Sequence, residues 1–208
     1  MHKAMYWEKA EDQKIQCYLC PHHCLIPAGK RGKCKVRINQ DGTLYTENYE
    51  MVTSVALDPI EKKPLYHFYP GSRILSIGTF GCNLRCDFCQ NWQISQERPP
   101  AQRLEVDHLP EFALRDESIG VAFTYNEPSI WYEYVLDGAK AVQEAGGKVA
   151  LVTNGFISPE PLEELLPHVD ALNIDLKSMD EEYYQKICGG EPGPVLESIR
   201  LAHEHQEV

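Results

Sequence analysis

The chain has 208 residues, of which 43% are hydrophobic and 10% aromatic, enough for one main core with a small appendage. Its 20 basic and 31 acidic residues give a net charge of −11, which repels phosphate backbones and anionic lipids, so we expect no nucleic-acid and no membrane partner. No apolar run approaches the ~20 residues that span a bilayer, and residues 1–10 lack the order of a signal peptide, so we expect a cytoplasmic protein.

Residues 1–57 are predicted to form a small cysteine-rich subdomain. The segment around its four cysteines is too short and too rich in turn residues to fold on an apolar core, and a reducing compartment keeps thiols free for metal binding. Two alternatives remain open, a structural zinc site and an auxiliary iron–sulfur cluster, because both accept four sulfurs, and His22 or His23 can replace one of them. Weak alternation around Asp41-Gly42 predicts a hairpin within residues 35–57. The four candidate ligands are Cys17, Cys20, Cys24 and Cys34.

Residues 58–72 are predicted to be a connector, in which two prolines withhold backbone donors. The favoured interpretation of Asp58 to His67 is an inert ordered loop. The alternative is a lid over an active site, with Glu61, Lys62 or His67 near the substrate.

From residue 73 the pattern changes to short apolar strands that alternate with segments of helical period, which predicts α/β architecture with a parallel sheet. The strands are expected at 73–79, 118–125, 148–154 and 170–176, and the helices at 107–115, 129–145, 159–166, 181–187 and 195–205. Parallel βα arrays carry their chemistry at the carboxyl ends of the strands, and polar or metal-binding residues follow each of these four strands.

Three cysteines follow the first of these strands within eight residues, at Cys82, Cys86 and Cys89. A cubane cluster has four irons, so three thiolates leave one iron open, whereas an electron carrier normally uses four cysteines. A zinc site would need a fourth ligand at conventional spacing, and none is near in the sequence. The loop therefore predicts a 4Fe-4S cluster with one iron free for chemistry. Cys188, by contrast, is expected to be a small buried hydrophobe.

This loop resembles the signature of the radical S-adenosylmethionine (SAM) superfamily, with Phe88 in the aromatic place before the last cysteine. The resemblance implies that the open iron chelates S-adenosylmethionine and that one electron cleaves it to a 5'-deoxyadenosyl radical. It also implies cofactor contacts from later strand ends. Glu127 matches the glutamate of the superfamily's Gly-Gly-Glu motif, whereas Asn126 departs from that motif and is a candidate to hydrogen-bond the cofactor instead. Two later stretches are similar to those of glycyl-radical-enzyme activases, and their candidate cofactor contacts are Asn154, Asp175 and Lys177.

Four stretches are similar to the radical enzyme of the AmmeMemoRadiSam system, a branch like the pyruvate formate-lyase activating enzymes. They are Cys20-Pro21-His22, residues 60–67, residues 82–92 and Tyr125-Asn126-Glu127-Pro128. This resemblance implies a low-potential electron donor, flavodoxin or ferredoxin, and either glycyl-radical activation or modification of a small molecule. It does not name the substrate.

The superfamily core is a partial (β/α) barrel of about six units. Residues 73–208 supply about four, and the chain stops inside a helix at Val208, so we expect a barrel that lacks its C-terminal units. A rival function is therefore a catalytically incomplete, metal-stabilised binding or scaffold module. A third, an electron-transfer protein, is disfavoured by the count of three cysteines.

Overall fold

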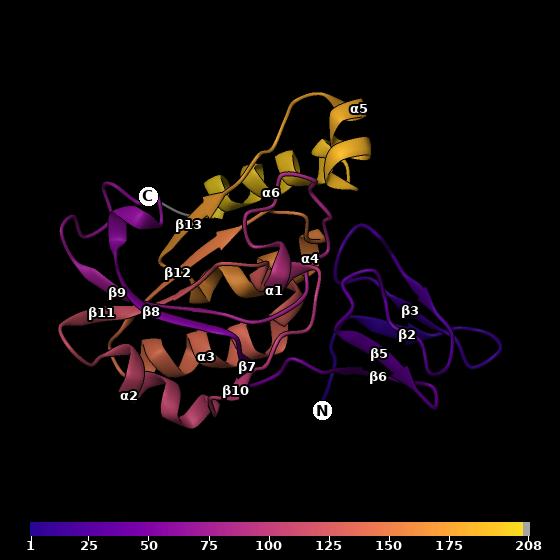
Figure 1. The fold of residues 1–208 in the computed structure, drawn as a ribbon, viewed down its shortest axis with the longest axis horizontal. Helices are drawn as coiled ribbons and strands as arrows, with labels where there is room; N and C mark the ends of the chain where they lie inside the picture. The colour runs from indigo at the N-terminus through magenta and orange to yellow at the C-terminus, as the bar shows by residue number, and fades with distance from the viewer. Residues whose placement is uncertain (206–208) are drawn as a thin grey trace.

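The computed structural model describes residues 1–205 and centres on a five-stranded sheet of order β13-β12-β11-β9-β8 (Figure 1). Four of its strands are parallel and follow one another across the sheet in chain order, which confirms the predicted βα repeat. These strands are β9 (Arg73–Gly78), β11 (Ser118–Phe123), β12 (Lys148–Thr153) and β13 (Ala171–Ile174).

Helices follow these strands, as the helical period predicts. The longest in the middle of the chain is α3 (Tyr132–Glu144), which continues a 3-10 turn η3 (Pro128–Trp131) and ends before Gly146, whose φ of +82° suits a glycine cap. The other α-helices are α1 (Trp92–Ser95), α2 (Leu109–Ala113), α4 (Pro159–Leu165), α5 (Glu181–Tyr183) and α6 (Pro192–His205). Shorter turns are the 3-10 helices η1 (Ile60–Lys62), η2 (Val106–His108) and η4 (Leu166–His168) and the π-helix η5 (Tyr184–Cys188).

The fifth strand of the sheet, β8 (Ser54–Pro59), lies antiparallel to β9, with Ser54 opposite Gly78 and Pro59 opposite Arg73. The domain boundary expected at residue 57 lies inside this strand, so the start of the connector belongs to the main sheet. An edge strand buries only some of its side chains, and Val55 is exposed, so its apolar pattern is weak. Pro59 is tolerated because it stands at the end of an edge strand.

The N-terminal residues form small sheets to one side of the main sheet (Figure 1). The predicted hairpin is confirmed, with its turn at Asp41 and Gly42. The strands are β1 (His2–Lys3), β2 (Trp7–Lys9), β3 (Ile15–Cys17), β4 (Leu25–Ile26), β5 (Arg37–Gln40), β6 (Thr43–Thr46) and β7 (Met51–Val52), which pairs with β10 (Gln102–Arg103).

One hydrophobic core runs from these small sheets into the main sheet and α3. A buried ion pair between Arg37 and Glu133 joins the N-terminal residues to α3. The Trp131 indole Nε1 also donates to the carbonyl of Asn48, at 2.7 Å. The N-terminal residues are therefore packed firmly against α3. None of the helices within residues 1–205 combines the length and apolar character that a bilayer crossing requires. The expected end of the chain in a helix at Val208 lies outside the described residues.

Candidate metal and cofactor site

A cavity of about 670 Å³ opens where the parallel strands end, and we call it the central cavity. Every residue predicted for the main site lines it, although those residues come from four separate strand ends. The cavity therefore lies where functional residues are expected in a parallel sheet, at the carboxyl ends of the strands. The predicted residues on its wall are Cys82, Cys86, Phe88, Cys89, Asn126, Glu127, Asn154, Asp175 and Lys177.

The three-cysteine loop (residues 82–89) leaves β9 through Gly81, whose φ is +92°. The Cys82 sulfur accepts hydrogen bonds from the Leu84 backbone N–H at 3.4 Å and from the Asn154 amide at 3.7 Å. Burial raises the pKa of Cys82 well above its ordinary value and raises the pKa of Cys86 to about 12. These thiols are therefore protonated unless a cation lies beside them.

No three His, Cys, Asp or Glu side chains in the described part of the chain lie close enough to share one ion. The cysteines of the three-cysteine loop nevertheless line one cavity. In an iron–sulfur cubane each protein thiolate binds a different iron, so its ligands need not converge on one point. The residues present therefore fit a group with several metal atoms better than they fit a single ion.

Asn126 holds the entrance of the three-cysteine loop. Its Oδ1 accepts a hydrogen bond from the Thr79 backbone N–H at 3.0 Å, and its Nδ2 donates to the Gly81 carbonyl at 2.8 Å. Both ends of the Asn126 side-chain amide are thus engaged by the chain that leads into the loop. Its predicted contact with a cofactor stays a prediction.

Glu127 is 1% exposed and joins the ends of two neighbouring strands. Its Oε1 accepts from the Ser129 N–H at 2.8 Å and from the Thr153 hydroxyl at 2.7 Å, and its Oε2 accepts from the Asn154 N–H at 2.8 Å. Burial raises the pKa of Glu127, and these hydrogen bonds oppose that effect. The carboxylate is therefore part of the framework of the site, and any cofactor contact is additional to three internal hydrogen bonds.

Asn154 and Asn83 form a buried amide network behind the cysteines. The Asn154 Nδ2 donates to the Asn83 Oδ1 at 2.9 Å, and the Asn83 Nδ2 donates to the Phe156 carbonyl at 2.6 Å. The His22 ring nitrogen Nε2 lies 2.6 Å from the Asn83 carbonyl, so the N-terminal residues contact the same loop. The sequence reasoning missed Asn83, because a single asparagine between two cysteines carries no pattern.

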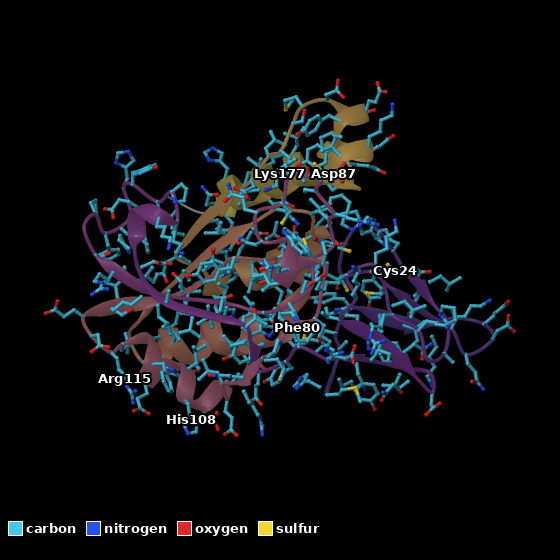
Figure 2. All side chains as sticks on the ribbon, viewed as in Figure 1. Cys24, Phe80, Asp87, His108, Arg115 and Lys177 are labelled. Carbon is cyan, nitrogen blue, oxygen red and sulfur yellow. The ribbon has the colours of Figure 1, made fainter. Side chains whose placement is uncertain are left out.

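Lys177 provides a cation on the cavity wall, close enough to Cys86 to act on it electrostatically. Its ammonium donates to Asp175 at 2.7 Å, and its backbone N–H donates to the Tyr184 hydroxyl at 3.1 Å. Burial, the largest single effect, lowers the pKa of Lys177, but the hydrogen bond with Asp175 and the nearby negative charges, that of Asp175 first, together raise the pKa overall. Lys177 and Asp87 of the three-cysteine loop lie at the same edge of the molecule (Figure 2), and both are close enough to Cys188 to act on it electrostatically.

The connector contributes to the central cavity through Lys62 and Lys63. Asp58 accepts hydrogen bonds from both ammonium groups at 2.8 Å and from the Tyr125 hydroxyl at 2.7 Å. Burial on its own raises the pKa of Asp58, but these three hydrogen bonds outweigh it and lower the pKa overall. This part of the connector is ordered and supplies two cations to the cavity wall, and its part near a substrate stays a prediction. Glu61 instead accepts from the Gly71 N–H at 2.7 Å.

The sequence profile of the Radical SAM superfamily matches residues 76–208, which is more than half of the chain and includes the three-cysteine loop and the three later strand ends. The chain belongs to the radical SAM superfamily.

Relatives of this radical SAM protein carry related names. An uncharacterized protein of Methanocaldococcus jannaschii is 44% identical over 205 residues, which cover 97% of this chain and 61% of that protein. A putative glycyl-radical enzyme activating enzyme of the same organism is 26% identical over 133 residues, 62% of this chain and 54% of that protein. The pyruvate formate-lyase 1-activating enzyme of Escherichia coli is 28% identical over 147 residues, 67% of this chain and 59% of that enzyme.

These names place the radical SAM protein among relatives of the pyruvate formate-lyase activating enzymes, as the resemblance in the sequence indicated. The chain spans between 54% and 61% of the length of these three relatives. The narrower assignment to the AmmeMemoRadiSam branch stays a prediction.

The four N-terminal cysteines of this radical SAM protein, which we call the N-terminal thiol group, line a second, small apolar cavity. The Cys24 sulfur accepts from the Lys33 N–H at 3.5 Å, and the Arg37 guanidinium donates to the Cys17 sulfur at 3.9 Å. Burial raises the pKa of Cys20 to about 12 and that of Cys34 to about 11.

The two ring nitrogens of His22 lie within hydrogen-bond distance of the Asn83 carbonyl and the Lys33 ammonium. The His22 ring is therefore engaged away from the sulfurs. The four thiols share this small cavity, although no three of them lie close enough to share one ion, and their part as ligands stays a prediction.

Proposed function

We propose that this chain is a radical SAM enzyme of the activating type, in which Cys82, Cys86 and Cys89 hold a 4Fe-4S cluster and the central cavity binds S-adenosylmethionine. When bound, these groups supply one-electron chemistry that cleaves S-adenosylmethionine to methionine and a 5'-deoxyadenosyl radical. The observation that carries the proposal is that three thiols from one loop and the polar ends of three further strands line a single cavity of about 670 Å³.

The number of thiols supports an open iron. Within the described part of the chain, Cys82, Cys86 and Cys89 are the cysteines that line the central cavity. Three thiolates leave one corner of a cubane for a ligand that is not protein. A carrier of electrons alone has no need of that corner or of a cavity of about 670 Å³ beside it.

The chain's own residues have distinct parts in this proposal. The amide of Asn154 donates to the Cys82 sulfur, and such hydrogen bonds stabilise a thiolate and orient it. Lys177 places a positive charge where a cofactor carboxylate could pair with it. Phe88, which is 49% exposed, covers part of the rim and restricts the access of water to the cavity.

The substrate is proposed from the relatives. Because two of them are named as activating enzymes, we propose that the hydrogen atom is taken from a glycine of a partner protein, with modification of a small molecule as the alternative. The reaction needs one electron from a low-potential donor, for which flavodoxin or ferredoxin is proposed. Lys62, which lines the cavity and has a side chain that is 60% exposed, gives a substrate with a carboxylate a place to bind.

The N-terminal thiol group is proposed to hold a second metal centre. Its sulfurs share one apolar cavity, and a backbone N–H and the buried Arg37 guanidinium donate to two of them, as is common around thiolate ligands. Both zinc and an auxiliary iron–sulfur cluster agree with four sulfurs. The number of zinc, iron and sulfide ions per chain in anaerobically purified protein decides between them, since four irons with one zinc indicate zinc and eight irons indicate a second cluster.

The reaction is tested with anaerobically reconstituted protein, dithionite and S-adenosylmethionine, with 5'-deoxyadenosine measured by chromatography. We expect product from the native chain and none from Cys86→Ala, whereas Cys24→Ala should still bind the first cluster. An iron-loaded native chain that releases no 5'-deoxyadenosine would instead support the incomplete scaffold module. A Cys86→Ala variant with native iron content and activity would refute the site itself.

A further inference from the structure

Three basic side chains gather on the surface beside the three-cysteine loop, and we call them the basic patch. They are Arg31 and Lys35 of the N-terminal residues and Arg98, which follows α1. Arg31 and Arg98 both donate to the carboxylate of Glu47, and the Lys35 ammonium donates to the Gln96 carbonyl at 2.7 Å. The fold therefore brings together cations that are distant in the sequence.

The basic patch presents positive charge to the solvent. The side chains of Arg31 and Arg98 are 43% and 54% exposed, whereas the Glu47 side chain that they share is 9% exposed. A partner therefore meets the guanidinium groups rather than the carboxylate. This local positive charge contrasts with the net charge of −11 of the whole chain. The exposed charged neighbours of the patch in the sequence are two lysines and one glutamate, Lys30, Lys33 and Glu97.

The backbone at Lys35 indicates that its place in the patch is specified. Its φ is +67°, in the left-handed region that residues with a side chain rarely adopt. Its neighbours Cys34 and Val36 are buried, so the turn leaves Lys35 alone at the surface. Such conformations persist only where the surroundings hold them, and they occur frequently at functional sites.

The basic patch lies against the backbone that supports the three-cysteine loop. Gln96, whose carbonyl accepts from Lys35, donates through its Nε2 to the Leu84 carbonyl at 3.0 Å. The Arg98 guanidinium lies 4.9 Å from the ring centroid of Phe80, which comes just before the loop. Within the described residues, none of the three cations of the patch lines the central cavity. A protein can therefore bind beside the loop without entering the cavity.

We propose that the basic patch is the docking surface for the electron donor, a protein that meets the patch with an acidic face. This inference rests on the proposed function, which needs one electron from such a protein. One electron passes from the donor, which is oxidised, to the cluster, which is reduced, and no bond or proton is transferred. Because the net charge of the chain repels an acidic protein elsewhere, the patch determines where the donor binds and in which orientation.

The test is the binding of a flavodoxin of net negative charge to the anaerobically reconstituted chain, measured by isothermal titration calorimetry. Lys35→Glu with Arg98→Glu reverses two charges of the basic patch, while Glu47 stays paired with Arg31. We expect the dissociation constant to rise about tenfold at low salt, and the difference from the native chain to shrink at ~0.5 M salt, which screens the charges. Lys35→Glu alone should give a smaller rise, and it keeps the test available if the double variant does not fold.

Arg115→Glu with Arg200→Glu is the matched control, because it makes the same change in net charge at two side chains that are half exposed. Arg115 lies well apart from Phe80, and so from the basic patch (Figure 2). We expect this control to change the dissociation constant less than about threefold. Equal weakening in both double variants would overturn the inference, because only the net charge would then matter. Native affinity in Lys35→Glu with Arg98→Glu, or no binding by the native chain, would also overturn it.

A comparison of two reductants separates the docking surface from the proposed function. Dithionite is a small molecule that needs no docking surface, so saturating dithionite should give the native rate of 5'-deoxyadenosine release in both double variants. Reduced flavodoxin should give a slower rate in the patch variant alone. A native rate with flavodoxin despite weaker binding would overturn the assignment to the donor. If flavodoxin binds the patch but the native chain releases no 5'-deoxyadenosine with dithionite, the proposed function fails while the binding surface stands.

Discussion

Replacing Glu127 by Gln separates a framework role from direct cofactor binding. The Glu127 carboxylate is buried and accepts hydrogen bonds from the Ser129 N–H, the Thr153 hydroxyl and the Asn154 N–H. A glutamine of the same size keeps one oxygen and turns an NH2 group toward one of these donors. We therefore expect Glu127→Gln to destabilise the fold even when no cofactor is present.

The magnitude follows from the geometry. The better orientation of the glutamine keeps its oxygen toward Ser129 and Thr153 and turns its NH2 group toward the Asn154 N–H. The Asn154 N–H then loses its hydrogen bond to a charged acceptor and remains as a buried, unpaired donor. A hydrogen bond to a charged group contributes about 1.5–3 kcal/mol, and an unsatisfied buried donor costs about 1–3 kcal/mol. Since these two estimates partly describe the same loss, we expect a decrease of about 3 kcal/mol in the free energy of unfolding.

The assay is urea unfolding of the metal-free chain, followed by circular dichroism. Glu144→Gln is the control, because Glu144 is exposed at the end of α3 and its replacement should change the free energy of unfolding by less than about 0.5 kcal/mol. Native stability of Glu127→Gln, combined with loss of S-adenosylmethionine binding in the reconstituted protein, would exclude the framework role of Glu127. That result would show that the carboxylate serves the cofactor rather than the framework.

Three further predictions concern residues around the same cavity. Gly81→Ala should lower both the free energy of unfolding and the iron content, because its Cβ would lie 2.7 Å from the Cys34 carbonyl. Gly29→Ala is the control, because Gly29 also has a positive φ but its Cβ would meet nothing within 4 Å, so this variant should retain native iron. Equal iron loss in both variants would contradict the prediction. Lys63→Met should lower the free energy of unfolding by about 3 kcal/mol, because it breaks a buried ion pair, and Lys62→Met, at a side chain that is 60% exposed, by less than about 1 kcal/mol in the same urea assay. Folding lowers the pKa of Asp58, so the contribution of Asp58 to the free energy of unfolding is complete above the pKa of the unfolded chain, about 4, and should be lost as the pH falls below that value. Asp58→Asn should flatten this part of the curve of stability against pH. An unchanged slope in that variant would count against the Asp58–Lys63 pair.

The sequence predicted the parallel part of the fold well because its signals are local. Strands buried on both faces read as continuous apolar runs, and α3 shows a clear apolar stripe and a glycine stop, so their positions agree with the structure to within a few residues. The rule that chemistry gathers at the carboxyl ends of parallel strands then grouped residues from four strand ends on one cavity.

Other features depend on contacts that no local pattern encodes. The pairing of β8 with β9 is a tertiary event, and an edge strand with an exposed valine gives little apolar signal. The cations of Lys62 and Lys63 reach the cavity because Asp58 holds them there, which the composition of the connector does not reveal. Cys188 is a small buried hydrophobe, as expected, but only the fold packs the end of η5 against the three-cysteine loop.

The predictions for Asn126 and Glu127 met a similar limit. The family resemblance implied that Asn126 and Glu127 face a cofactor. Their side chains are largely engaged with the protein, Asn126 with the entry to the three-cysteine loop and Glu127 with the β12 end. A family motif locates a residue in space, but the hydrogen bonds that the residue makes depend on what the rest of this chain presents to it. Their part in binding stays a prediction that the variants above address.

We propose that protein thiolates hold only three of the four corners of the cluster. Electron paramagnetic resonance of the dithionite-reduced native protein, recorded before and after S-adenosylmethionine is added, examines that free corner. We expect the cofactor to change the cluster's spectrum because it binds the free iron. An intact cluster whose spectrum stays the same at saturating S-adenosylmethionine would show that no iron is free.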